Sequence, residues 1–286
     1  MSGHSPLPAA IPLRADDDMP VGSAVDPISA TAELGATGPA IRRSVPPSAI
    51  LRWLSAGLAD FSRAPLPSLA VGLICTLVSW AIVGAMVATD YAVLILPLTA
   101  GFMFAAPLLA VGLYEGSRLH ACNQPVTLGA TRAALGRNAS QIAFMGALLM
   151  LFLYGWLRIA TMLFALFFGL ELPPLGSFLS TAFLARENLD FVLVGTGVGA
   201  VMAAIVFGLS AISIPMLIDR PMDAITAAIT SMRACCANPV TMGLWAAAIV
   251  ALTLAAAVPA FLGFIVVLPI LGHATWHAYR DLVDPA

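Results

Sequence analysis

The chain has 286 residues, of which 60% are hydrophobic and only 10% charged, and its mean hydropathy is +0.95. A soluble domain carries about 25% charged residues, so this composition excludes a soluble globular protein and indicates an integral membrane protein. The net charge is −2 and no run of basic residues is present, which excludes nucleic acid as an expected partner.

Residues 1–45 differ in composition from the rest of the chain. They are rich in Pro, Ala, Ser and Gly, carry an acidic run at residues 16–18, and show no helical or alternating pattern. Such a segment buries too little apolar surface to offset the entropy of the chain. We therefore predict a disordered cytoplasmic tail, followed by an integral membrane domain at residues 46–282.

Within that domain, apolar segments recur at lengths near the roughly 20 residues that cross a bilayer. The last two come from one apolar run, 240–272, which we divide at Pro259 because a single helix of that length would be about 50 Å long. The predicted transmembrane segments are 66–89, 91–114, 139–160, 191–218, 240–258 and 260–279.

Three short amphipathic segments, near 46–65, 125–137 and 221–239, precede the pairs of spans. Pro47 and Pro65 are 18 residues apart, as are Pro221 and Pro239. This spacing predicts an all-α polytopic membrane protein of six transmembrane helices, built from three helix-hairpin repeats that each begin with an interfacial helix. In the first of these helices, Asp60 falls on the polar face. A further short interfacial helix is expected in the loop at 171–190.

The arginines favour one orientation in the membrane. All basic residues are Arg, and with six spans eleven of the thirteen fall on the side that holds the amphipathic segments and both termini. The positive-inside rule then places both termini in the cytoplasm.

Three stretches carry a resemblance to a known family: TAGFMFAAPLLAVGLYEGSR (99–118), SAISIPMLIDR (210–220) and LPILGHATWHAYRDL (268–282). Together they resemble the bacterial integral membrane family catalogued as domain of unknown function 2189, over about residues 46–282. The resemblance implies a multi-pass protein of the bacterial inner membrane, and it implies no established activity.

Polar side chains gather where the spans of each repeat end. We predict that they form a polar cluster near the cytoplasmic face, either as a ligand or ion vestibule or as interfacial anchors. His273 is expected to be the more deeply buried histidine, with Asp219 as its partner, and to tolerate replacement less well than His277. The predicted cluster is Glu115, Arg118, His120, Asp219, Arg220, His273, His277 and Arg280.

His273 and His277 are four residues apart, so they share one helix face and are weak candidates for a joint metal site. They could not both be axial ligands of one haem, and a hydrogen-bonded structural pair is the alternative. No Ser-His-Asp order, paired carboxylates or phosphate-binding loop is present. We therefore expect no catalytic residues, no cofactor and no enzymatic activity.

These observations favour a non-enzymatic membrane protein that organises or assists partners. The expected partners are the lipid bilayer and other membrane proteins. One alternative is a small transporter or channel, whose path would be lined by Arg158, Asp219 and His273. Another is a metal- or haem-related membrane protein that uses His273 and His277.

Overall fold

The computed structural model describes residues 38–89, 94–169 and 188–284. The predicted interfacial helix within the loop at 171–190 lies almost wholly outside these ranges. The described regular elements are α-helices, apart from an isolated bridge between Ile41 and Val283. The helices are α2 (Ala49–Arg63), α3 (Pro65–Ala88), α4 (Ile95–Leu109), α5 (Val111–Ala121), α6 (Leu128–Arg137), α7 (Ala139–Phe168), α9 (Leu189–Ser210), α10 (Ser213–Asp219), α11 (Ala224–Ala237), α12 (Pro239–Ala257) and α13 (Phe264–Leu282).

The all-α membrane architecture is confirmed. Five stretches of the described chain are long and apolar enough to cross a membrane: α3, α4 with α5, α7, α9 with α10, and α12. Many of their large apolar side chains are exposed, as expected where lipid is the solvent. The predicted sixth span corresponds to α13, which is not among these five, so the count of six stays a prediction.

The last apolar run is broken around Pro259, because α12 ends at Ala257 and α13 begins at Phe264. Ala260 and Phe261 have positive φ angles of 51° and 64°, which are uncommon for residues other than glycine. Side chains of α3 hold this strained turn. Thr76 Oγ1 donates to the Phe261 carbonyl at 3.2 Å, and the indole of Trp80 donates to the Ala260 carbonyl at 2.7 Å.

The three predicted short helices are present as α2, α6 and α11, and each leads directly into a long helix. Asn138 and Asn238 lie at the start of α7 and α12, at the same point of two repeats. The Asn138 amide donates to the carbonyls of Leu217 and Met222, and the Asn238 amide donates to those of Arg42 and Ala234. Asn138 therefore links the start of α7 to the segment before α11, and Asn238 links the start of α12 to the segment before α2.

The integral domain begins earlier than predicted. Residues 38–45 were assigned to the tail, yet Arg42 N donates to the Leu282 carbonyl, and Val45 is buried with its N–H on the Asn238 side chain. These backbone bonds order the segment against the C-terminal end, which its own composition could not indicate. The rest of the predicted tail, residues 1–37, lies outside the described residues.

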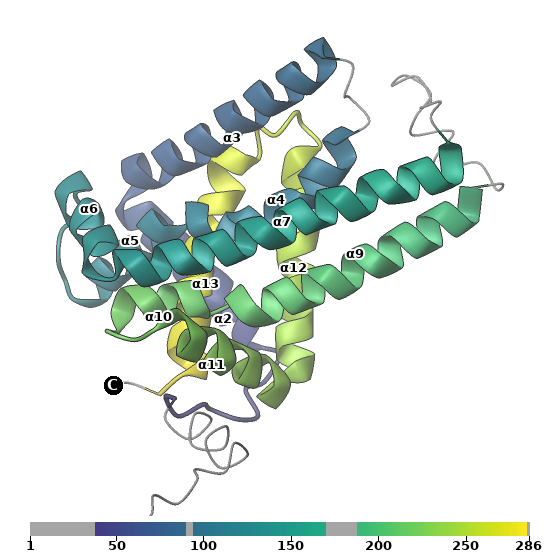
Figure 1. Ribbon diagram of the computed structural model, residues 1–286. Helices are drawn as coiled ribbons and strands as arrows, with labels where there is room; N and C mark the ends of the chain where they lie inside the picture. The colour runs from purple at the N-terminus through teal and green to yellow at the C-terminus, as the bar shows by residue number, and fades with distance from the viewer. Residues whose placement is uncertain (1–37, 90–93, 170–187, 285–286) are drawn as a thin grey trace, which may run out of the picture. The chain divides into compact units, whose positions relative to one another are not determined.

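Helix α13 lies at the centre of the packing and contacts α2, α3, α5, α10 and α12 (Figure 1). Glycines on two neighbours permit the close approach. A Cβ at Gly57 would lie 2.7 Å from the Ala274 nitrogen, and one at Gly72 would lie 2.3 Å from the Ile265 carbonyl oxygen. Small residues allow backbones to pack directly in this way, and α13 brings its own polar side chains into the contact.

Candidate polar site

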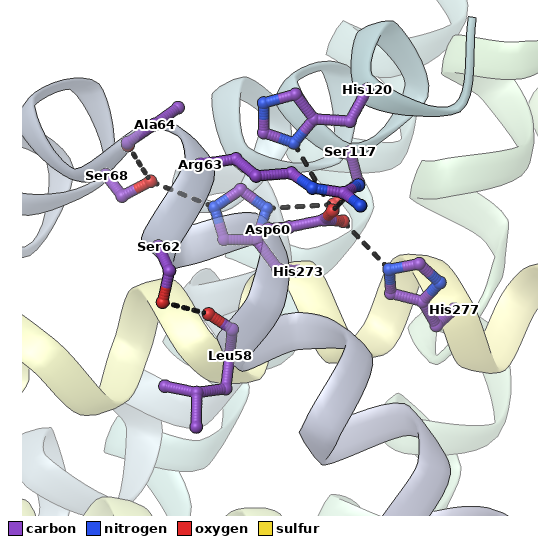
Figure 2. A network of polar contacts seen from close by, with 10 residues as sticks. All are labelled: Leu58, Asp60, Ser62, Arg63, Ala64, Ser68, Ser117, His120, His273 and His277. Atoms are coloured by element: carbon purple, nitrogen blue, oxygen red, sulfur yellow. Dashed lines mark hydrogen bonds and ion pairs between the residues drawn. The ribbon is translucent and has the colours of Figure 1, made fainter. Parts of the chain in front are cut away.

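Asp60, at the C-terminal end of α2, is the centre of a polar network that joins three helices (Figure 2). Its carboxylate lies 2.8 Å from Nε2 of His277 on α13, 3.3 Å from Nδ1 of His120 on α5, and 3.6 Å from the Arg63 guanidinium. An ionised carboxylate can only accept hydrogen bonds, so both histidines donate to it from these nitrogens. The network thus fixes the ends of α2, α5 and α13 to one another.

The pKa of the Asp60 carboxyl reflects two opposing effects. Burial raises it, but the hydrogen bonds from His277 and Ser117 and the nearby imidazole groups together outweigh burial, so the pKa lies below its usual value. A carboxylate at the C-terminus of a helix also opposes the helix dipole. The surrounding donors offset that repulsion and keep Asp60 ionised.

His273 lies next to this network and is 1% exposed. Its Nδ1 lies 2.8 Å from Ser117 Oγ, and its Nε2 lies 3.0 Å from Ser68 Oγ. Because the Ser68 hydroxyl donates to the Ala64 carbonyl at 2.8 Å, it accepts from Nε2–H, and Nδ1 faces the Ser117 hydroxyl. The histidine is therefore fully paired by two serines.

Asp219, the partner predicted for His273, is bound elsewhere, so that prediction is wrong. The Tyr279 hydroxyl donates to Asp219 at 2.6 Å, and Arg280 lies 3.2 Å from the same carboxylate oxygen. The Arg220 guanidinium donates to the Tyr279 hydroxyl at 2.9 Å. The orientation of α13 about its own axis directs the Tyr279 side chain, and not that of His273, toward α10.

Glu115 forms a third group. It is 0% exposed, and its carboxylate takes two hydrogen bonds from Arg118 at 2.7 and 2.8 Å and one from Arg137 at 2.7 Å. This two-pronged geometry is the strong form of the arginine–carboxylate pair. It neutralises the buried carboxylate and ties α6 to α5.

The predicted cluster is thus divided into three separately satisfied groups at the ends of α2, α5, α10 and α13. One holds His120, His277 and, through Ser117, His273; another holds Glu115 and Arg118; the third holds Asp219, Arg220 and Arg280. Sequence reasoning missed Asp60, which it had placed on the polar face of α2. Trp53, Gly57 and Asp60 are all buried. Their spacing in the sequence places them on one face of α2 and could have indicated that Asp60 faces the protein interior.

The two histidines weighed as metal ligands have different partners. Both ring nitrogens of His273 are used by serines, while His277 binds Asp60. Among the described residues, no group of three or more His, Cys, Asp or Glu side chains could hold a metal ion.

A cavity of about 1070 Å³ lies between α4, α7, α9 and α12, and α3, α5, α11 and α13 also contribute to its wall. The residues that line it are almost all apolar. None of Arg158, Asp219 and His273, which were expected along a transport path, is among the described lining residues. The polar network and the cavity are therefore separate features.

Helices of this length and apolarity, arranged around a buried polar network, define a polytopic helical membrane protein. Residues 95–219 match the family model described as a predicted integral membrane protein, domain of unknown function 2189. This match confirms the resemblance seen in the sequence, over a shorter range than the expected 46–282. Searches of curated proteins and of solved structures find no match for the chain.

Proposed function

We propose that this chain is a non-enzymatic membrane protein that holds an apolar molecule within its helical bundle, and so assists partners in the same membrane. The cavity is the observation that carries the proposal. Its volume of about 1070 Å³ lies just above the roughly 300–1,000 Å³ range of small-molecule pockets. Its walls come from candidate membrane spans, so its natural ligands are molecules dissolved in the bilayer.

The polar groups support a structural role for the chain's titratable residues. Asp60, Glu115 and Asp219 each bind arginine, histidine or tyrosine side chains at 2.6–3.6 Å. Groups paired in this way hold helix ends together, which favours a binding protein over a catalyst. The cavity's apolar wall also favours an apolar ligand over the polar solute of the transporter alternative.

We further propose that the protein lies in a bacterial inner membrane with both termini in the cytoplasm, on the strength of the arginine distribution. Cys122 is exposed at the end of α5. In a variant that keeps Cys122 as its only cysteine, we expect a membrane-impermeant maleimide to label inverted vesicles but not intact spheroplasts. Labelling of spheroplasts would contradict this orientation.

Filling the cavity should expel its ligand. Gly243 on α12 lines the cavity, and a Cβ built there meets no atom within 4 Å. We expect Gly243→Phe to remove, by at least about tenfold, the apolar molecules that co-purify with the protein, because the ring takes up the space they need. Organic extraction and native mass spectrometry of the purified protein measure this.

Gly84→Phe is the matched control. Gly84 lies on the apolar helix α3, has no atom within 4 Å of a built Cβ, and is not among the lining residues. The control should retain the bound molecules and fold as the wild type does. Equal retention by both variants would contradict the proposal.

A further inference from the structure

The lining residues of the cavity extend far along two helices. On α12 its lining residues run from Pro239 to Leu254, a distance of about 22 Å at 1.5 Å per residue. On α9 they run from Phe191 to Ser210, which is about 28 Å. A lining that extends over much of the roughly 30 Å hydrocarbon core offers contacts along the whole length of an acyl chain.

The described lining residues include no charged side chain and no histidine. Cys235, which reaches the wall, is kept protonated because burial, together with the adjacent Cys236, raises its pKa to about 12. An ionised headgroup in such a site would lose its hydration without gaining a partner. The wall therefore favours an uncharged ligand.

The buried hydroxyls of Tyr114 and Thr253 in the wall form no hydrogen bond within the described chain, but the Thr253 hydroxyl can reach the carbonyl four residues earlier in α12 by rotation about one bond. Tyr114 is 3% exposed and lines the cavity, yet no hydrogen bond joins its hydroxyl to any group in the described chain. By contrast, Thr99, Ser210 and Thr275 donate to carbonyls four residues earlier in their own helices. A tyrosine hydroxyl stands too far from its own helix backbone for this, so it needs an acceptor in the cavity.

The position of Tyr114 gives the ligand a direction. Tyr114 lies on α5, one residue before Glu115 of the polar groups, and Ser210, Cys235 and Pro239 line the same end of the cavity. The opposite end is formed by the apolar cluster of Leu163, Phe164 and Phe191. A ligand with one polar end and one apolar end matches this gradient.

We propose that the cavity binds an uncharged long-chain lipid whose single hydroxyl or carbonyl oxygen accepts a hydrogen bond from Tyr114. This inference rests on the proposed function and specifies its ligand class. An alcohol and an ester share the acceptor oxygen, whereas only the alcohol can also donate. A fatty acid of the same length differs from both in being ionised.

The test uses photoreactive analogues of hexadecanol, methyl palmitate and palmitate, each with a diazirine in the chain, added to the full-length protein in nanodiscs. We expect saturable labelling by hexadecanol or methyl palmitate on α9 and α12, and at least about tenfold weaker labelling by palmitate. Preference for one neutral probe would tell whether the natural polar group is a hydroxyl or a carbonyl. Labelling by palmitate as strong as by the neutral probes would overturn the proposal.

Tyr114→Phe should raise the half-saturating mole fraction of the preferred neutral probe by about fivefold to tenfold, the effect of one lost hydrogen bond. Tyr154→Phe, on the exposed surface of α7 and outside the cavity wall, should leave it unchanged. An effect of Thr253→Val as large as that of Tyr114→Phe would overturn the assignment of the polar end to Tyr114. A Tyr114→Phe variant that labels like the wild type would overturn the inference. If its labelling were still abolished by Gly243→Phe, the proposed function would stand; labelling insensitive to Gly243→Phe would remove both.

Discussion

Replacing Gly72 with alanine should destabilise the protein by about 3 kcal/mol, at the upper end of the usual cost of overpacking. The new Cβ would lie 2.3 Å from the Ile265 carbonyl oxygen and 2.7 Å from its Cα. Both atoms are backbone, so no side-chain rotation can relieve the clash, and α3 must move away from α13. Equilibrium unfolding in mixed detergent micelles measures the change.

The same substitution at Gly84 provides the control on the same helix. A Cβ there meets nothing within 4 Å, so only helix propensity changes, which favours alanine by up to about 1 kcal/mol. Gly84→Ala should therefore be neutral or slightly stabilising. Similar unfolding of the two variants would show that α3 does not pack closely on α13.

His273→Ala should cost about 3 kcal/mol of unfolding free energy, because it leaves a cavity and removes one hydrogen-bond partner from each of two buried serine hydroxyls. Ser68 and Ser117 are both buried, so water cannot readily replace the imidazole. The sequence predicts that His273 tolerates replacement less well than His277. This stays a prediction, and its reason is now the pairing of His273 with two buried serines instead of with Asp219. Unfolding in mixed micelles again provides the measurement.

His277→Ala is the matched comparison four residues along α13. The His277 side chain is 30% exposed, and Asp60 keeps His120 and Arg63 as partners, so we expect a loss of about 1 kcal/mol. An equal loss for both variants would mean that the serines adjust to the missing ring. The histidines would then act alike, as anchors of one helix end.

Local features of the sequence predicted most of the helices but not the breaks between α4 and α5 and between α9 and α10. Apolar length predicted the candidate spans, the proline spacing predicted the short helices before α3 and α12, and Pro259 marked the break between α12 and α13. Each of these depends on the hydrophobicity or backbone freedom of neighbouring residues, which a sequence displays directly.

Only the tertiary structure decided which groups meet. Asp60 looked like part of a solvated face, and Asp219 looked like the partner of His273, because helical periodicity gives the residues of one face but not the rotation of that face toward another helix. Gly57 and Gly72 set this rotation by letting the α13 backbone approach α2 and α3. The cavity, and the placing of Tyr114 in its wall, likewise arise from gaps between helices distant in the sequence, which no local pattern records.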